Sequence, residues 1–208
     1  MRYDRCRKIF SKFKKLQNLK VLICGVGGVG GYALDCLYKS GVKNITIIDY
    51  DTYDITNQNR QIGSDFINEK KVEVLAKLYP GIAPVDMKLT PENIKKIDFN
   101  NYDIIIDAID DIKAKTALII STYPKIISSM GAAKRIDPTK IKIDSIWKTQ
   151  IDPFAKKIRQ ELKKLNFKGD FPVVYSTEKP INCNMGSFIG VTGVFGFTIC
   201  SEILKKFI

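Results

Sequence analysis

A glycine-rich turn is the first feature of the sequence that could do chemistry. The run GVGGVG follows an apolar segment and precedes a segment of helical pattern; its glycines are Gly25, Gly27, Gly28 and Gly30. Such glycines let backbone N–H groups and a helix N-terminus approach phosphate oxygens closely. Asp49 ends the next apolar segment, where an acid can bind ribose hydroxyls. The combination indicates an adenine nucleotide, either ATP or NAD, and a tight turn without a ligand is the alternative.

Charged residues further along the chain favour ATP. A dinucleotide's diphosphate can be bound largely by backbone amides, whereas a triphosphate needs Arg, Lys or magnesium. The candidates are Asn57 and Arg60, then Lys70 or Lys71, and finally Asp110. Taken singly, the cations would more often be surface charges, and Asp110 would more often be a helix cap. Their order along the chain, at the ends of successive elements, supports a triphosphate site.

These residues must be positioned by alternating strands and helices. Strands are predicted at 20–24, 44–49, 84–89, 102–108 and 125–129, with helices at 28–39, 65–78, 91–97 and about 111–122. This alternation predicts an α/β fold with a Rossmann-like, doubly wound and mostly parallel sheet. In such a sheet the carboxyl ends of the strands face one crevice, so the candidate residues should meet there.

The chain length favours one domain. With 208 residues, a single α/β domain with a substantial core is expected over 1–208. We divide it into a basic, amphipathic N-terminal helix (1–19), a nucleotide-binding core (20–131) and a C-terminal elaboration on the same core (132–208) for substrate binding or dimer contacts. The elaboration should contain strands at 141–143 and 172–175, a charged helix at 153–165 and a buried apolar helix or helix pair at 185–199.

The apolar segment at 185–199 is too short to cross a bilayer, which takes about 20 residues. The N-terminus is polar and carries no visible secretion signal, so we expect no membrane span and a cytoplasmic location. Five cysteines without a CxxC pair fit reduced thiols, with Cys24 and Cys36 in the core and no disulfide framework. The absence of histidine excludes Ser-His-Asp and Cys-His nucleophiles and His-ligated metals.

The net charge of +12 is concentrated in two stretches. Residues 1–20 contain eight Lys or Arg against Asp4 alone, and residues 134–168 contain eleven against four acids. Localised positive charge indicates a polyanionic partner such as a nucleic acid. Solvated lysine-rich helix faces are the alternative.

The chain resembles the ThiF/MoeB-type adenylating enzymes, relatives of the ubiquitin-activating enzymes. The matching stretches are GVGGVGG at 25–31, IIDYDTYDITNQNRQ at 47–61, KVEVLA at 71–76 and DAIDD at 107–111. Enzymes of this type join ATP to a carboxylate, release pyrophosphate and leave an acyl-adenylate. The resemblance assigns nucleotide binding to the glycines above and to Asp49, Asp51, Asn57, Arg60, Gln61, Lys71 and Asp110, with catalytic roles for Arg60, Lys71 and Asp110.

The resemblance also implies three features that lie beyond the nucleotide. Asp110 would contact magnesium, and a monovalent cation of unspecified identity could accompany it. Arg5 would act catalytically by reaching the phosphates of a partner subunit, which implies a homodimer. The sequence departs from the family pattern just before Lys71, where Asn68-Glu69-Lys70 replaces a glycine-containing lead-in, so Lys71 is preferred over Lys70 on the strength of Val72.

Downstream motifs are similar to one branch of the family, the tRNA threonylcarbamoyladenosine dehydratases. They are SMGA at 129–132, RIDPT at 135–139, VVYSTE at 173–178 and VFGF at 194–197. This resemblance implies ATP-dependent adenylation of the threonyl carboxylate on a modified adenosine beside the anticodon. The substrate's own carbamoyl group would then attack and AMP would leave, which explains how the chain can lack a histidine. Modified tRNA would be the partner of the basic stretches.

Three other functions remain open at this stage. The first is adenylation of the C-terminus of a ubiquitin-like sulfur-carrier protein, the second a nicotinamide-dependent dehydrogenase, and the third a tRNA-binding module without catalysis. A sulfur-transfer protein is a further possible partner, because Cys183 aligns with a cysteine of some relatives linked to such proteins. We favour an ordinary thiol there, since nothing nearby in the sequence would lower its pKa.

Overall fold

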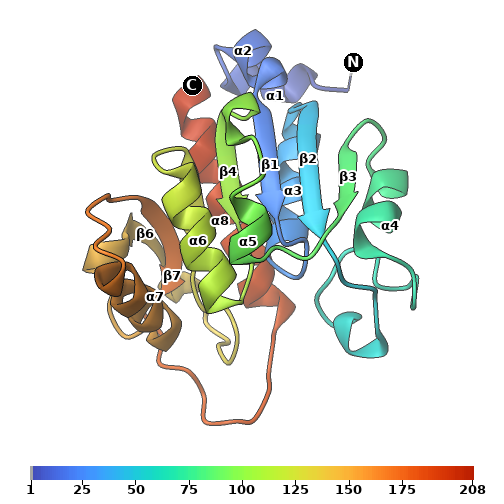
Figure 1. Cartoon of the computed structure of the whole chain (residues 1–208). Coiled ribbons are helices and arrows are strands. Elements are labelled where there is room, and N and C mark those ends of the chain that lie inside the picture. Colours follow the sequence, from blue (N-terminus) through green and yellow to red (C-terminus); the bar gives the residue numbers. More distant parts are fainter. Residues whose placement is uncertain (1) are drawn as a thin grey trace.

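A seven-stranded sheet forms the centre of the computed structural model, which describes residues 2–208 (Figure 1). The strands lie in the order β3-β2-β1-β4-β5-β7-β6, and all pair in parallel except β6, which is antiparallel to β7. Their bounds are β1 Lys20–Cys24, β2 Asn44–Asp49, β3 Ala83–Asp86, β4 Ile104–Asp107, β5 Ile126–Ser129, β6 Ile141–Ser145 and β7 Pro172–Ser176. The predicted α/β doubly wound fold is confirmed, and β6 and β7 extend the same sheet.

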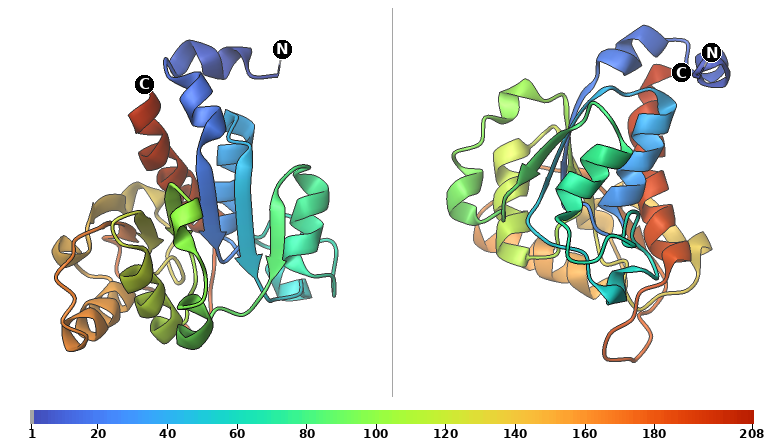
Figure 2. Two further views of the ribbon diagram at one scale, coloured as in Figure 1. Left: turned by 45° about the horizontal axis from the view of Figure 1, so that its top comes forward. Right: turned by 90° about the vertical axis from the view of Figure 1, so that its right-hand side faces the viewer.

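Helices cover both faces of the sheet (Figure 2). One face carries α3 (Gly30–Ser40), α4 (Lys71–Leu78) and α8 (Ile189–Leu204), and the other carries α5 (Pro91–Ile94), α6 (Ile112–Thr122) and α7 (Pro153–Lys164). Within β1, Val21 and Ile23 join the core under the first layer, while Leu22 and Cys24 join the core under the second. The strand is therefore apolar at successive positions because both of its faces are buried.

The apolar C-terminal segment forms the single helix α8, packed against α3. Val191, Phe195 and Ile199 are fully buried on it. A Cβ atom at Gly196 would lie 2.5 Å from the Val29 carbonyl oxygen, so the two helices approach closely only because this residue is glycine. Among residues 2–208 no helix is long and apolar enough to cross a membrane.

Several predicted helices have different bounds in the structure. The helix predicted at 91–97 ends at Ile94, the one predicted at 185–199 spans Ile189–Leu204, and two others differ more. The N-terminal helix is broken into α1 (Asp4–Ile9) and α2 (Phe13–Asn18), because the backbone is extended at Phe10 and the Lys12 N–H donates to the Phe207 carbonyl. The helix predicted at 65–78 begins only at Lys71, since Asn68 has a φ of 66° and Lys70 bridges to Thr52. Short 3-10 helices are η1 Ile55–Asn57, η2 Phe99–Asn101, η3 Pro138–Lys140, η4 Ile146–Lys148 and η5 Lys205–Phe207.

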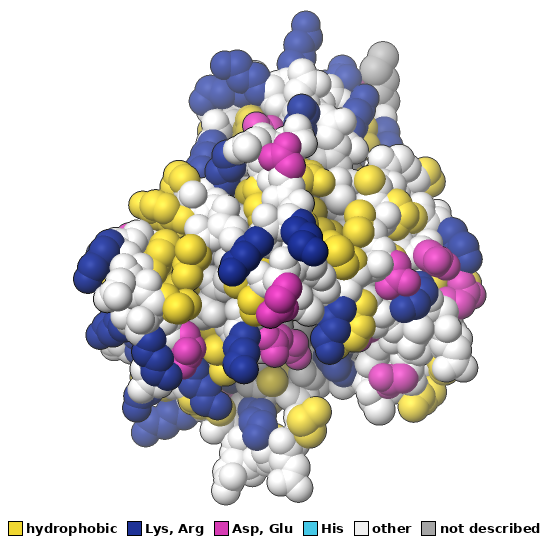
Figure 3. Space-filling model, viewed as in Figure 1, with side chains coloured by type: hydrophobic (Ala, Val, Ile, Leu, Met, Phe, Trp, Pro, Cys, Tyr) yellow, Lys and Arg dark blue, Asp and Glu magenta, His cyan; other side chains and the backbone are white. Residues whose placement is uncertain are grey.

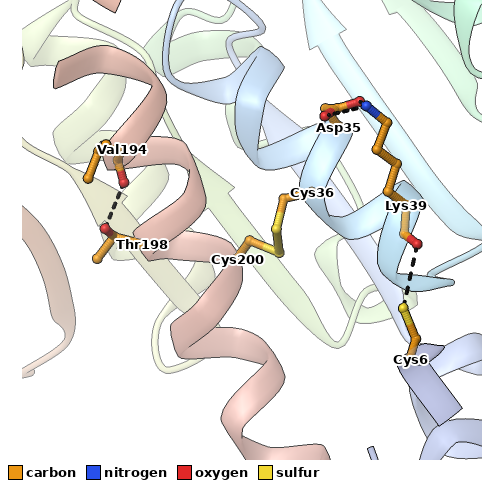
Figure 4. Close-up of a disulfide and its surroundings, with 7 residues drawn as sticks. All are labelled: Cys6, Asp35, Cys36, Lys39, Val194, Thr198 and Cys200. Carbon is orange, nitrogen blue, oxygen red and sulfur yellow. Dashed lines mark hydrogen bonds and ion pairs between the residues drawn. A yellow bond between two sulfur atoms is a disulfide. The ribbon is translucent and has the colours of Figure 1, made fainter. Parts of the chain in front are cut away.

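A disulfide between Cys36 of α3 and Cys200 of α8 corrects the expectation of reduced thiols throughout (Figure 4). The two cysteines are 164 residues apart in the sequence, and the packing of α3 on α8 brings their Cα atoms to 6.2 Å. Sequence spacing could not reveal this pair, because only the contact between the two helices brings the cysteines together. The free cysteines are Cys6, Cys24 and Cys183.

Thiol counting tests this cross-link. We expect three alkylated cysteines when the protein is unfolded without reductant and five after reduction, measured by mass spectrometry. Because the cross-link restricts the unfolded chain, reduction should also lower the free energy of unfolding by about 2–5 kcal/mol in urea titrations. The Cys200→Ala variant is the control, because its stability should not respond to reductant. Five alkylated cysteines before reduction would contradict the disulfide.

Candidate nucleotide-binding site

A cleft of about 930 Å³ opens at the carboxyl ends of the parallel strands, the lower edge of the sheet in Figure 1. Its walls come from the segments that follow β1, β2, β3, β4 and β5 and from the start of α8. The volume lies within the range typical of small-ligand sites. The sheet therefore gathers residues from distant parts of the chain into one site, as the topology predicts.

The glycine turn between β1 and α3 leaves no room for side chains at two positions. Gly25 has a φ of 85°, and a Cβ atom there would lie 2.8 Å from the Ala108 carbonyl oxygen. A Cβ atom at Gly30 would overlap the Gly25 carbonyl oxygen. A Cβ atom at Gly28 would lie 3.3 Å from the Thr192 side chain and 3.4 Å from Arg60 Cγ, which is a tight contact. The turn thus presents backbone rather than side chains to the cleft, which suits phosphate oxygens.

Asp49, at the end of β2, links the second strand to this turn. Its Oδ2 accepts the Val26 N–H at 2.8 Å, and its Oδ1 accepts the Asp51 N–H at 3.0 Å. A carboxylate can accept about four hydrogen bonds, so two sites remain for hydroxyl donors in the cleft. The same side chain therefore orients the glycine turn and faces the cleft as a ribose-binding acid would.

The loop after β2 places the predicted cations. The Arg60 Nη1 donates to the Thr56 carbonyl oxygen at 2.7 Å and to the Asn59 side chain at 2.8 Å. Lys71, at the first position of α4, has a 6% exposed side chain whose Nζ lies 2.9 Å from Asp51 Oδ2. Lys70 turns away, to Asp86 at 3.2 Å and the Tyr50 carbonyl. Of the two lysines, Lys71 is the one that lines the cleft.

Capping of η1 holds the remaining members of this loop. The Asp54 side chain accepts the Thr56 N–H, and the buried Asn57 amide accepts the Asp54 N–H at 3.4 Å. The hydrogen bond from the Thr56 hydroxyl lowers the pKa of Asp54 below its usual value. Asn57 and Gln61 both line the cleft. The Gln61 amide oxygen is buried there and has no hydrogen-bond donor within the described residues, so a ligand hydroxyl could satisfy it.

Two adjacent acids after β4 have different tasks. Asp111 caps α6, accepting the Ala114 N–H at 2.8 Å. Asp110 is exposed and lines the cleft. Among the described residues 2–208 its carboxylate has no hydrogen-bond or ion-pair partner. Asp111 rather than Asp110 is therefore the helix cap, and the Asp110 carboxylate is available to a ligand.

A buried ion pair holds the loop that carries Asp110. Asp107, the last residue of β4, and Lys115 of α6 are both fully buried, with 2.8 Å between Oδ1 and Nζ. The same Nζ donates to the Ile109 carbonyl at 2.9 Å, and the Ser128 hydroxyl donates to Asp107 Oδ2 at 2.6 Å. Burial raises the pKa of Asp107, and the nearby ammonium opposes that rise. The Asp107–Lys115 pair therefore connects the end of β4, the loop that carries Asp110 and helix α6 beneath the cleft.

Most of the predicted site residues meet in this cleft. Those that line it are Gly25, Gly27, Gly28, Asp49, Asp51, Asn57, Arg60, Gln61, Lys71 and Asp110, with Gly30 packed behind the turn. Arg5 is exposed on α1, near the opposite edge of the sheet in Figure 1, and does not line the cleft of its own chain.

Several lining residues were missed by sequence reasoning. Met87 and Leu89 follow β3 and could have been found as residues at a strand's carboxyl end. Thr192 comes from α8 and Lys134 from the segment after β5, and no sequence motif marks either as a lining residue.

The acids of the cleft suit a metal that arrives with phosphates. Over residues 2–208, no group of three or more Asp, Glu or Cys side chains could hold a metal ion by itself. Mg²⁺ commonly uses one or two carboxylates together with substrate phosphates and water. The free Asp110 carboxylate in a cleft shaped for phosphates fits that mode of binding.

Comparisons with known proteins agree with this geometry. The sequence model of the ThiF family matches residues 6–208. The tRNA threonylcarbamoyladenosine dehydratase of Escherichia coli is 34% identical, with 89% of this chain and 85% of that protein covered. The enzyme of the same name from Bacillus subtilis is 37% identical, with coverages of 80% and 70%. Crystal structures of the Escherichia coli enzyme in complex with ATP and with AMP each have a TM-score of 0.93 and 32% identity, covering 99% of this chain and 93% of theirs.

The Asp107–Lys115 pair provides a test of how the loop is held. Lys115→Met should lower the free energy of unfolding by roughly 3–5 kcal/mol, because it leaves the Asp107 charge buried without a partner. The double variant Asp107→Asn, Lys115→Met should lose less free energy of unfolding than the single variant, since no charge is then buried. Lys113→Met, on the exposed side of the same helix, is the matched control and should change stability by less than about 0.5 kcal/mol. Urea unfolding measures all three. A single variant as stable as the control would show that the pair does not hold the loop.

Proposed function

Because the chain belongs to the ThiF family, we propose that it dehydrates threonylcarbamoyladenosine in tRNA, beside the anticodon, in an ATP-dependent reaction. The observation that carries this proposal is the agreement between the cleft and the relatives. Glycine turn, Asp49, Arg60, Lys71 and Asp110 line one site. Relatives that align with 89% and 80% of this chain are named tRNA threonylcarbamoyladenosine dehydratases.

The first chemical step joins ATP to the substrate. The threonyl carboxylate attacks the α-phosphorus of ATP, an O–P bond forms, and pyrophosphate leaves with the electron pair of the broken P–O bond. Backbone N–H groups of the glycine turn bind phosphate oxygens, and Asp49 binds the ribose. Arg60 and Lys71 stabilise the negative charge that builds on the phosphates. Magnesium, held by Asp110 and the phosphates, would add to that neutralisation.

The second step closes the ring. The carbamoyl group of the substrate attacks the acyl carbon of the adenylate, releases a proton, and displaces AMP, which keeps one oxygen of the original carboxylate. The nucleophile belongs to the substrate, so the protein needs only to hold the two groups together and exclude water. This accounts for a site without histidine, and the fully buried Cys24, whose thiol pKa is raised by burial, is unsuited to act as a nucleophile.

The basic stretches lie at different ends of the molecule. In Figure 3, Lys and Arg side chains gather over α1, α2 and the C-terminal end, and again over α7. We assign the tRNA backbone to the α7 region, because α7 begins at Pro153, which lines the cleft. Binding there should weaken steeply with salt.

The α1 region serves the homodimer in this proposal. Arg5, exposed and outside its own cleft, would reach the phosphates in the partner subunit. The protein would work in the cytoplasm, and a monovalent cation would be a further cofactor. A sulfur-transfer protein remains a possible partner through Cys183, which is exposed.

A nucleoside assay tests the proposed function. Purified protein is incubated with ATP, magnesium and tRNA carrying threonylcarbamoyladenosine, and the digested nucleosides are analysed by mass spectrometry. We expect an ATP-dependent loss of one water from that nucleoside. If the nucleoside is unchanged, and pyrophosphate exchange responds to a ubiquitin-like protein instead, the carrier-protein function is correct.

Two variants test the roles of the cleft residues. Arg60→Ala and Asp110→Ala should each reduce turnover by about 100-fold or more, because each removes a group that stabilises charge on the phosphates. Affinity for the modified tRNA, measured by filter binding without ATP, should stay nearly unchanged. Lys95→Ala is the control, because Lys95 is exposed and does not line the cleft. Release of the tRNA by either cleft variant would show that its assigned role is wrong.

A further inference from the structure

One wall of the cleft is the segment 129–135, which follows β5. It lies beside the long loop before α8, drawn in orange to red at the bottom of Figure 1. The Lys134 N–H donates to the Gly186 carbonyl at 2.9 Å, and the Lys134 carbonyl accepts the Ile181 N–H at 2.7 Å. The backbone of Lys134 is thus held on both sides by this loop.

Lys134 has an unusual backbone conformation. Its φ is 62°, in the left-handed region that residues with a Cβ atom adopt at a cost of about 1–2 kcal/mol. Glycine, asparagine or aspartate would fit this conformation better. A lysine kept in a strained conformation at the wall of a binding cleft is an observation that points to a use for its side chain.

The neighbouring Arg135 explains how the strained segment is fixed. Arg135 is 3% exposed, and its Nη2 lies 3.3 Å from Asp152 Oδ2. Asp152 Oδ2 also accepts the Gly131 N–H at 3.1 Å, and Oδ1 accepts two N–H groups at the start of α7. The Arg135 Nε donates to the Glu178 carbonyl at 3.2 Å. Arg135 is therefore a buried cation paired with Asp152, and its Nη2 has no hydrogen-bond acceptor among the described residues.

The Lys134 ammonium differs from the other cations that line the cleft. Lys71 pairs with Asp51, Arg135 with Asp152, Lys88 lies over the Tyr50 ring, and Arg60 is held by a carbonyl and an amide. Among the described residues 2–208, the Lys134 side chain has no hydrogen bond, ion pair or ring contact. Lys134 is therefore a half-buried cation without an anionic partner in the described part of the chain.

We propose that Lys134 is a substrate-binding residue that recognises the threonyl carboxylate of the modified tRNA, an inference that rests on the function proposed above. The carboxylate must approach a triphosphate, and both carry negative charge. A cation on the cleft wall opposes that repulsion and orients the carboxylate. The phosphates have Arg60 and Lys71, which leaves the Lys134 ammonium for the carboxylate.

Binding measurements with paired tRNAs test this inference. Affinities are measured without ATP for one tRNA with and without its threonylcarbamoyl group. The wild type should bind the modified tRNA about 10-fold to 100-fold more tightly, the contribution expected of a charge-assisted hydrogen bond. Lys134→Asn keeps a residue suited to the left-handed backbone and removes the charge. It should abolish most of this preference while ATP affinity stays unchanged and thermal stability does not fall, and Lys134→Arg should retain the preference.

Lys156→Gln is the matched control, because it removes one positive charge from an exposed position of α7 outside the cleft. It should weaken the binding of both tRNAs equally and leave the preference for the modified tRNA intact. An undiminished preference in Lys134→Asn, or equal weakening of both tRNAs, would overturn the inference, as would a wild type that dehydrates its substrate without any preference. A wild type that neither prefers nor dehydrates the modified tRNA would overturn the proposed function and this inference with it.

Discussion

The site depends on how closely three strand ends approach one another around Gly25. The Gly25 N–H donates to the Ile48 carbonyl of β2 at 2.8 Å, and the Ala108 N–H after β4 donates to the Cys24 carbonyl of β1 at 2.8 Å. A side chain at Gly25 would collide with the Ala108 carbonyl, so β1, β2 and β4 can end together only if this residue is glycine. The same approach brings Asp49 to the turn. One steric constraint therefore sets the positions of the glycine-turn backbone and of Asp49, to which we assign phosphate binding and ribose binding.

Some of the charged side chains in and beneath the cleft pair with each other, and others have no charged partner and are available to a ligand. Asp107 with Lys115, and Arg135 with Asp152, are buried ion pairs that also hydrogen-bond the neighbouring backbone, although Arg135 Nη2 has no hydrogen-bond acceptor among the described residues. Breaking such a pair is costly, because it strands a charge in a medium that cannot solvate it. These pairs fix the loops that display Asp110 and Lys134, neither of which has a charged partner within the described part of the chain. The buried pairs stabilise the fold, and the Asp110 and Lys134 side chains close to them in the sequence stay available to the ligands that we propose.

The sequence predicted many of the residues that line the cleft, because the signals that mark them are local. A glycine run between strand and helix, an acid at a strand end and the order of Arg60, Lys71 and Asp110 can all be found without tertiary information. Features that arise from contacts between distant segments were missed. The Lys70–Thr52 bridge shortens α4, the contact of Lys12 with the C-terminal end breaks the first helix, and Cys36 meets Cys200 only because α8 packs on α3. Residues such as Thr192 enter the cleft for the same reason, so periodicity and spacing carry no sign of them.

The central claim is that the cleft activates a carboxylate of the substrate as an adenylate. Its most direct test follows the oxygen atoms. Modified tRNA whose threonyl carboxylate is labelled with ¹⁸O is converted in a single turnover, and the AMP, pyrophosphate and any inorganic phosphate are analysed by mass spectrometry. The account predicts one ¹⁸O atom in AMP and none in pyrophosphate, because the carboxylate oxygen that attacks the α-phosphorus leaves with AMP. Label in inorganic phosphate, with ADP as the nucleotide product, would contradict the account, since it would mean that the γ-phosphate activates the carboxylate.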